Sequence, residues 1–291
     1  MATIFDLGEN DCYTLPGEWR HMDRLYSDSI RRDVVENPEI LQVRSDDCFV
    51  VTYPKSGTTW TLEMTRLVMN YGVTSTKQHN ILPFLELKVD KKSRDSTLYD
   101  GFSMTEKMES SRLVKSHLPV GALTKDLFTE GCKIIVVARN PKDVAVSFYY
   151  FYKSEKESFG DYDGDFHHFL RMFMNGKVLY GDWFTHVLEW WQCCRDNKNI
   201  LFLKYEDMKK DPRSATARIA DYLGYDLNDD VIDKITEHCS FKNMKKAPAI
   251  ESTVRKGIVG DWKNYFTVAE NEAFERIYNE KMKGTGLSFE W

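Results

Sequence analysis

Three short runs of almost continuous apolar residues, with a weaker fourth, limit what this chain can fold into. They lie at Cys48–Tyr53, Lys133–Ala138, Asn199–Lys204 and, less clearly, Arg112–Ser116. Continuous runs of this length are typical of parallel strands buried on both faces, whereas half-exposed strands alternate apolar and polar residues. Helical patterns lie between them, so the sequence predicts an α/β fold with a central, mainly parallel sheet flanked by helices.

The intervening segments have apolar residues at helical spacing. One predicted helix face carries Trp60, Met64, Leu67, Val68 and Tyr71, and another carries Phe166, Phe169, Leu170 and Phe173. Farther along, Asp211 and Pro212 are the residue types of an N-cap and a first helical position, and Gly224 is expected to end that helix.

The chain is long enough for a sizeable core and has no obvious division into parts. Of its 291 residues 42% are hydrophobic, and no linker rich in Pro, Ser or Gly interrupts them. We therefore expect one domain over residues 1–291. The polar segment Lys88–Ser111 has no strong period and is interpreted either as a mobile lid or as a surface excursion.

Charge and cysteine usage exclude several classes of partner. The formal net charge of -5 argues against general affinity for nucleic acid or an anionic membrane. The start of the sequence lacks the apolar segment of a signal peptide, and the longest aliphatic stretches are strand-sized. Six scattered cysteines have no metal-ligand spacing and are predicted to be buried free thiols. These features together predict a cytoplasmic protein.

The segment Tyr53–Trp60 has the residues of an anion-binding loop at the expected topological position. It follows a predicted strand and opens an amphipathic helix, where free backbone N–H groups and the helix dipole attract phosphate. Lys55 can direct its charge at the same anion. The hydroxyl groups of Ser56, Thr58 and Thr59 can donate to the anion or cap the helix.

The order of residues differs from that in the ATP-binding loop of kinases. In kinase-type loops a lysine follows the last glycine and the next hydroxyl residue holds magnesium, whereas here Lys55 precedes Gly57. Arg139 follows the run Lys133–Ala138, so no aspartate stands where a metal-binding acid is expected. A small-molecule or nucleotide kinase is therefore the alternative function, a non-catalytic nucleotide-binding protein is a further one, and no metal site is predicted.

Four segments, in family order, resemble the cytosolic sulfotransferases. Tyr53–Trp60 resembles that family's 5′-phosphosulfate loop, and Lys115–Pro119 resembles its catalytic segment. Arg139–Ser147 and Arg255–Lys263 are similar to its two 3′-phosphate segments. The resemblance implies a P-loop-like fold and transfer of a sulfonate group from 3′-phosphoadenylyl sulfate (PAPS) to a hydroxyl or amine of a small, largely apolar acceptor. The other product would be 3′-phosphoadenosine 5′-phosphate (PAP).

The resemblance also implies which residues bind the donor. Trp60, Tyr205 and Phe241 are expected to enclose the adenine, because flat apolar walls suit its ring. Arg139 follows a predicted strand and can reach the ligand edge of the sheet. The expected donor contacts are Lys55, Ser56, Gly57, Thr58, Thr59, Trp60, Arg139, Ser147, Tyr205, Phe241, Arg255, Lys256 and Gly257.

The catalytic roles follow from the same resemblance. His117 is the implied general base, which would accept the proton of the acceptor as that atom attacks sulfur. Lys55 is expected to stabilise negative charge on the leaving oxygen, and Lys115 is expected to hold the sulfonyl oxygens. Ser147 is implied to restrain Lys55 until the acceptor arrives.

Phe84 and Phe151 are the implied acceptor-binding aromatics, beside Lys115 and His117. Packing in the core is the alternative interpretation of both rings. Leu87 stands where phenol-handling members often have an aromatic residue, which changes the width and stacking of the pocket. The acceptor class therefore stays open among phenols, amines, steroids and other alcohols.

The segment Lys263–Glu272 matches the family's dimer pattern K-x-x-x-T-V-x-x-x-E. It implies a twofold homodimer with Val268 at the apolar centre of a small interface. A helix start capped by Thr267 is the alternative interpretation, and both can hold together.

Overall fold

The four predicted strands form one parallel sheet in the order β6-β3-β7-β8. A computed structural model describes residues 4–8, 12–74, 82–89, 99–246 and 255–291. In it β3 (Cys48–Thr52) pairs with β6 (Leu113–Ser116) and β7 (Lys133–Ala138), and β7 pairs with β8 (Ile200–Lys204). The predicted α/β fold with a mainly parallel central sheet is confirmed.

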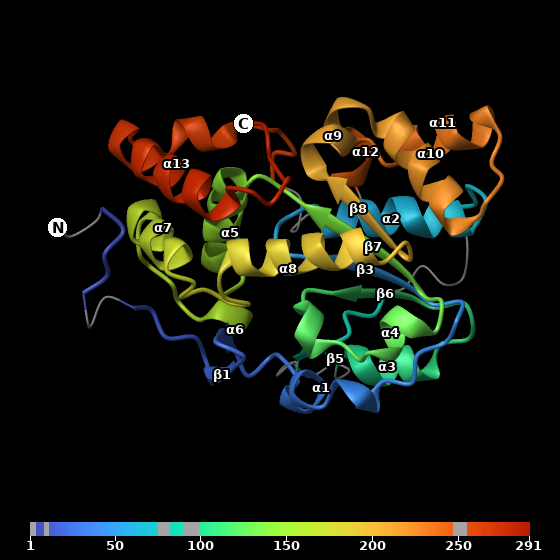
Figure 1. Cartoon of the computed structure of the whole chain (residues 1–291), viewed down its shortest axis with the longest axis horizontal. Coiled ribbons are helices and arrows are strands. Elements are labelled where there is room, and N and C mark those ends of the chain that lie inside the picture. The colour runs from blue at the N-terminus through green and yellow to red at the C-terminus, as the bar shows by residue number, and fades with distance from the viewer. Residues whose placement is uncertain (1–3, 9–11, 75–81, 90–98, 247–254) are drawn as a thin grey trace.

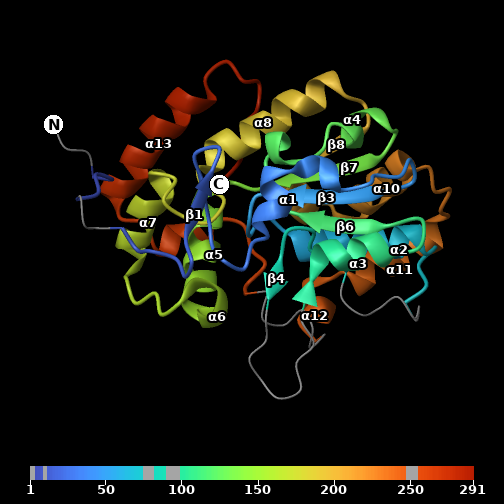
Figure 2. The same cartoon turned by 90° about the horizontal axis from the view of Figure 1, so that it is seen from below.

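Helices cover both faces of the sheet (Figure 1). The longer ones are α2 (Thr58–Met69), α5 (Pro141–Ser154), α7 (Phe166–Met174), α8 (Trp183–Asp196), α10 (Pro212–Leu223), α11 (Asp229–His238) and α13 (Val268–Met282). The shorter ones are α1 (Arg32–Glu36), α3 (Gly101–Lys107), α4 (Asp126–Thr129), α6 (Lys156–Phe159), α9 (Tyr205–Lys210) and α12 (Phe241–Met244). In both views α7 and α13 lie at one end of the molecule and α10 and α11 at the other (Figures 1 and 2).

Two small antiparallel sheets accompany the central one. The first joins β1 (Trp19–His21) to β2 (Arg24–Tyr26), and the second joins β4 (Lys88–Val89) to β5 (Tyr99–Asp100). Both belong to segments in which the sequence predicts no regular element.

Alternate residues of the central strands contribute to two apolar clusters on opposite faces of the sheet. Cys48 and Val50 of β3 pack in the cluster that contains apolar residues of α2, α10 and α11. Phe49 and Val51 belong to the cluster that contains residues of α5, α7, α8 and α13. Burial on both faces explains why this strand is a continuous apolar run in the sequence.

The predicted helix boundaries are confirmed at α10, and the predicted apolar face is wrong at one residue of α2. The Asp211 carboxylate accepts a hydrogen bond from Ser214 N, and Gly224, at a φ of 80°, ends the helix. Tyr71 was expected to share the buried face of α2, but the helix ends at Met69. Tyr71 has a φ of 51° and is 61% exposed, because its position beyond the helix no longer follows the helical spacing.

The described part of Lys88–Ser111 is more regular than its sequence suggests. It contains β4, β5 and the whole of α3, whose first turn is capped by Asp100 through Ser103 N. Gly101 lies so close to Phe84 that a Cβ atom there would be 1.7 Å from the Phe84 carbonyl oxygen. Residues 90–98 lie outside the described part, so the mobile lid stays a prediction.

The cysteine prediction is partly wrong. All six cysteines are free, and Cys48, Cys132 and Cys239 are buried as expected. Cys193 and Cys194 in α8 are only half-buried, and Cys12 is exposed because it lies in the N-terminal segment before β1. No helix in the described ranges is long and apolar enough to cross a membrane.

Candidate functional site

The carboxyl ends of all four central strands open onto one cavity of ≈ 630 Å³. Ligands of parallel sheets usually bind at this edge. Sixteen predicted site residues line the cavity: Lys55, Gly57, Thr58, Thr59, Trp60, Phe84, Lys115, His117, Arg139, Ser147, Phe151, Tyr205, Phe241, Arg255, Lys256 and Gly257. Ser56 is fully buried beneath the loop and is not part of this lining.

The loop between β3 and α2 is built to expose backbone donors. Gly57 is the N-cap of α2 with a φ of 103°, and the first N–H groups of the helix have no acceptor within it. A Cβ atom at Gly57 would also lie 2.7 Å from the Tyr205 ring. Both the positive φ and this close approach therefore require glycine at residue 57. The Ser56 Oγ atom is buried and has no hydrogen-bond partner among the described residues. An anion at this helix start fits both kinds of donor.

Lys55 lies in the cavity without a carboxylate partner in the described part of the chain. Its Nζ atom lies 3.9 Å from the centroid of the Phe151 ring, an attractive cation–π arrangement. Burial, together with the charges of Lys115 and Arg139, lowers the Lys55 pKa to about 7. An anion bound here would therefore restore the charge of a lysine that is neutral in part of the molecules.

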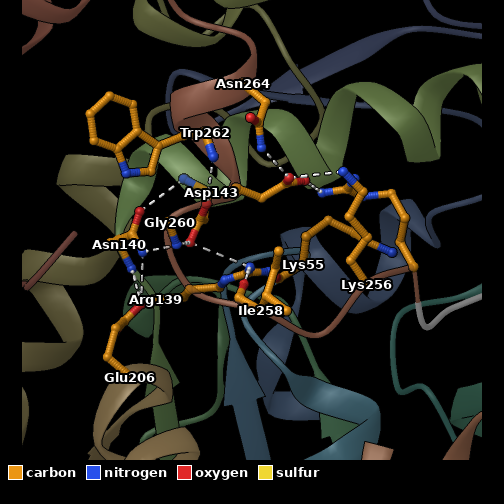
Figure 3. A network of polar contacts seen from close by, with 12 residues as sticks. Lys55, Arg139, Asn140, Asp143, Glu206, Lys256, Ile258, Gly260, Trp262 and Asn264 are labelled. Carbon is orange, nitrogen blue, oxygen red and sulfur yellow. Dashed lines mark hydrogen bonds and ion pairs between the residues drawn. The ribbon is translucent and has the colours of Figure 1, made fainter.

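Arg139 joins the Lys55 loop to the segment after Lys256. Its guanidinium donates to the Lys55 carbonyl oxygen at 3.2 Å and to the Ile258 carbonyl oxygen at 3.1 Å (Figure 3). It also lies over the Tyr205 ring, 4.5 Å from the centroid. The buried Nε atom has no partner among the described residues, so donors remain for a ligand.

Buried polar groups fix the Arg139 and Arg255 segments to each other (Figure 3). The Asp143 carboxylate accepts from Gly260 N at 2.8 Å and Trp262 N at 3.0 Å. Asn140 donates to the same carboxylate through Nδ2 and donates to Glu206 through its backbone N. Residues more than a hundred positions apart in sequence are thereby held in register.

Arg255 and Lys256 share one buried carboxylate. Arg255 Nη2 donates to Asp261 Oδ2 at 2.6 Å, and Lys256 Nζ donates to Asp261 Oδ1 at 2.8 Å. Asn264 donates to the same side chain at 3.0 Å (Figure 3). Burial opposes its charge, but these hydrogen bonds hold the Asp261 pKa below its usual range, so the carboxylate is charged at neutral pH and orients both cations.

The three predicted adenine-site rings all line the cavity. Trp60 and Tyr205 meet edge to face with their centroids 5.6 Å apart. Phe241 packs directly on Gly257, where a Cβ atom would be 2.3 Å from the ring. A side chain at residue 257 would displace this ring, so the glycine of the Arg255 segment and the aromatic wall depend on each other.

His117 follows β6 and is held so that one ring nitrogen remains available. Its Nδ1 atom lies 2.8 Å from the Thr52 carbonyl oxygen, which can only accept, so Nδ1 carries the hydrogen. Thr52 Oγ1 lies 3.1 Å from the same nitrogen and 2.7 Å from Thr58 Oγ1 in the phosphate loop. Burial, with the charge of Lys115, lowers the His117 pKa well below its usual value. The ring is therefore neutral at neutral pH, with its Nε2 lone pair free to accept a proton.

Lys115 and Phe84 lie beside His117. Phe84 forms a parallel bridge to Lys115, and the Lys115 Nζ atom lies 4.1 Å from the Phe84 centroid. The rings of Phe84 and His117 meet edge to face at 4.9 Å. Phe84 and Phe151 thus line the cavity under the two lysines and also pack against the core, so their role in acceptor binding stays a prediction.

The rest of this side of the cavity is largely apolar. The lining includes side chains that the sequence did not single out, namely Ser29, Ile30, Val89, Tyr99, Met104, Phe148, Glu155, Phe159, Leu179 and Tyr180. Leu87 lines it as well. These residues come from five separate segments, so no local pattern could identify them.

Ser147 lies on α5 in the cavity wall, but its hydroxyl group does not hydrogen-bond to Lys55 in the described structure. Lys55 lies over the Phe151 ring instead. No group of three or more His, Cys, Asp or Glu residues in the described ranges could hold a metal ion.

The sequence analysis did not predict the supporting residues Asn140, Asp143 and Glu206. The only sequence signal for them was Asn140-Pro141, a typical N-cap and first helical residue.

Comparison with known proteins identifies relatives over most of the chain. A family model described as the sulfotransferase domain matches residues 45–286. Sulfotransferase 1B1 of the dog, Canis lupus familiaris, is 43% identical over 272 residues, which cover 87% of this chain and 89% of that protein. The matched range contains all predicted site residues from Lys55 to Gly257.

Solved structures also match this chain over most of its length. Mouse sulfotransferase SULT7A1, crystallised with PAP, superposes with a TM-score of 0.78 and 32% identity, covering 92% of this chain and 94% of that chain. Retinol dehydratase in a complex with retinol and PAP has a TM-score of 0.78 and 26% identity, covering 90% of this chain and 89% of that chain.

Proposed function

The chain belongs to the sulfotransferase family, and from that premise we propose how its cavity performs the reaction. It is a PAPS-dependent sulfotransferase that transfers a sulfonate group to a small acceptor and releases PAP. The kinase alternative is not favoured, since the family match and the position of Lys55 before Gly57 both oppose it.

The donor would be held at the ends of β3, β7 and β8. The α2 N-terminus, Ser56 and Lys55 suit its 5′-phosphosulfate group, because they offer uncompensated donors and charge. Arg139, Ser147 and the Arg255–Gly257 segment suit its 3′-phosphate. Trp60, Tyr205 and Phe241 would enclose the adenine.

The observation that carries the mechanism is the hydrogen bond from His117 Nδ1 to the Thr52 carbonyl oxygen. It fixes the neutral tautomer whose Nε2 atom faces no partner among the described residues. The acceptor's hydroxyl or amine would give its proton to this Nε2 atom as its oxygen or nitrogen bonds to sulfur. Because the bridging S–O bond breaks in the same displacement, negative charge grows on the departing phosphate.

Two lysines would stabilise charge during this displacement. Lys55 lies on the phosphate loop and suits the leaving oxygen, whereas Lys115 lies beside His117 and suits the sulfonyl oxygens. Ser147 would restrain Lys55 in the donor complex before the acceptor binds.

The assembly and location of the enzyme are also proposals. Val268 is 76% exposed at the start of α13, which supports a homodimer through Lys263–Glu272. Thr267 and Glu270 also form a capping box there, so the segment begins a helix as well. We retain the cytoplasm as the compartment and one domain over residues 1–291. The single domain is supported by the apolar cluster that joins Phe5 to Phe289, and the cytoplasm is supported by six free thiols, three of which are buried.

The test is transfer of labelled sulfonate from PAPS to a panel of phenols, amines, steroids and aliphatic alcohols, with chelator present. We expect turnover on at least one class and release of PAP in equal amount. Tight PAP binding without transfer to any acceptor would contradict an enzymatic role. Magnesium-dependent transfer of phosphate from ATP would favour the kinase instead.

A further inference from the structure

A fully buried carboxylate lies directly behind the catalytic segment and has no part in the mechanism above. Glu86 belongs to the segment after Pro83 that runs beside β6. Lys115 N donates to the Pro83 carbonyl oxygen at 2.9 Å, and Leu85 N donates to the Lys115 carbonyl oxygen at 2.9 Å. Two residues farther along, His117 N donates to a side chain instead of a backbone carbonyl group. Its acceptor is Glu86 Oε1, at 2.7 Å.

A second donor fixes the same carboxylate oxygen. The Tyr180 hydroxyl group donates to Glu86 Oε1 at 3.1 Å. Tyr180 has a φ of 67°, and its backbone N donates to the Leu25 carbonyl oxygen of the β1–β2 hairpin at 2.8 Å. Its ring meets the His117 ring edge to face at 5.4 Å. Glu86 Oε1 therefore links the His117 backbone to the Tyr180 side chain, whose ring also packs against the His117 ring.

The other oxygen of Glu86, Oε2, is buried and has no well-aligned hydrogen bond among the described residues. The Ser116 hydroxyl group and the Glu86 backbone N–H lie close to the carboxylate and lower its pKa against the effect of burial. A carboxylate in such a place is costly unless a nearby cation compensates its charge. The side chain lies on the segment that pairs with Lys115, whose Nζ atom rests on Phe84, two residues before Glu86.

The nearest charge facing Lys115 from the phosphate side is Lys55, on the loop after β3. His117, just beyond the end of β6, and His186 behind it are neutral, because burial lowers their pKa values. Tyr99 and Tyr180 on the Glu86 side are neutral phenols whose pKa burial raises. Burial lowers the Lys115 pKa to about 8, and Glu86 opposes that change. Burial raises the Glu86 pKa itself to about 7.

We propose that Glu86 is a positioning residue for sulfonate transfer, which fixes the His117 backbone and keeps Lys115 charged beside the reacting group. This inference rests on the proposed function, because it assigns the Lys115 charge to the sulfonyl oxygens. Removing only the negative charge should therefore neutralise Lys115 at a lower pH while leaving the base in place.

The test is the pH dependence of kcat/KM for the acceptor, at saturating PAPS, in Glu86→Gln. The amide oxygen can still accept from His117 N and Tyr180, so the fold and the acid limb should persist. We expect the alkaline limb to move to lower pH by about one unit, the smaller end of the shift from a nearby opposite charge. Glu280→Gln, which removes one exposed carboxylate from α13, should leave the profile unchanged.

Lys115→Arg keeps the test decisive even if Glu86→Gln does not fold. A guanidinium stays charged throughout the range, so this variant should lose the alkaline limb, and Glu86→Gln should then cause no further shift. An alkaline limb that stays in place in Glu86→Gln or in Lys115→Arg overturns the proposal. Absence of labelled transfer by the wild type and Glu280→Gln would instead contradict the proposed function.

Discussion

Two pairs of cations line the same cavity and are held in different ways. The outer pair, Arg255 and Lys256, is bonded to the buried carboxylate of Asp261 at 2.6 and 2.8 Å. This pairing raises the Lys256 pKa. The outer cations are therefore charged and oriented before any ligand arrives, which suits recognition of a phosphate that does not change during the reaction.

The inner pair, Lys55 and Lys115, lies over aromatic faces instead. Their Nζ atoms are 3.9 and 4.1 Å from the centroids of Phe151 and Phe84. Burial lowers their pKa values to about 7 and about 8. Neither lysine makes a direct ion pair with a carboxylate in the described part of the chain, and such cations gain most where negative charge develops. From this difference we propose that the outer pair selects the donor and that the inner pair, with His117, performs the transfer.

The largest effect should follow from removing the base. His117→Ala should lose roughly 10²- to 10⁴-fold in turnover, the usual contribution of a general base, while its calorimetric affinity for PAP stays near that of the wild type. His21→Ala, a change on β1, is the matched control and should keep full turnover. Near-normal turnover of His117→Ala on a hydroxyl acceptor would remove this residue from the mechanism.

The next effect should be a loss of donor selectivity at the outer pair. Arg255→Ala should reduce the preference for PAPS over adenylyl sulfate, which lacks the 3′-phosphate, by roughly 10- to 100-fold, because hydrogen bonds to charged groups contribute about 1.5–3 kcal/mol. Ratios of kcat/KM for the two donors measure this directly. Arg276→Ala on the exposed side of α13 is the control, and an unchanged ratio in Arg255→Ala would contradict the role.

A smaller effect should appear in the number of protons that the protein takes up when PAP binds. Lys55 has a pKa of about 7 without ligand, and a bound phosphate favours its charged form. Binding of PAP should therefore take up about half a proton at pH 7 and approach one at pH 8, and affinity should fall as pH rises through this range.

Calorimetry in buffers of different ionisation enthalpy measures this uptake. Lys55→Arg, which stays charged, should bind PAP without the Lys55 contribution. Equal uptake by the wild type and Lys55→Arg at pH 8 would show that another group titrates.

The smallest effect on chemistry should come from the surface outside the cavity. Val268→Glu should break the proposed homodimer in sedimentation experiments while leaving turnover per active site unchanged, since Val268 is exposed and does not line the cavity. A dimer that survives this change, or a wild type that is monomeric at micromolar concentration, would contradict the proposed interface.

The sequence predicts the donor side of the cavity better than the acceptor side, for a physical reason. Each donor residue at a strand end is adjacent to a run of apolar residues that identifies the strand, as at Lys55, Arg139 and Tyr205. The topology of a parallel sheet then brings these ends together. Local pattern and sheet geometry therefore place these three residues at the cavity, whereas Trp60, Phe241 and the Arg255 segment were predicted from the family resemblance.

The acceptor side and the buried carboxylates depend on contacts between distant segments. Asp143 accepts from Gly260 N, 117 positions away, and Glu86 accepts from His117 N, 31 positions away. No spacing rule relates such positions. Tyr71 was misplaced for the opposite reason, because helical spacing was extended past the last helical residue at Met69.

The most direct measurement determines two quantities, the single-turnover transfer rate and the affinity for PAP, in both His117→Ala and Arg255→Ala. For each variant, both quantities are measured on the same protein preparation. The division between inner and outer groups predicts that His117→Ala loses turnover and keeps PAP affinity. It also predicts that Arg255→Ala loses PAP affinity and keeps most of its single-turnover rate at saturating PAPS. Loss of both quantities in the same proportion in both variants would contradict that division.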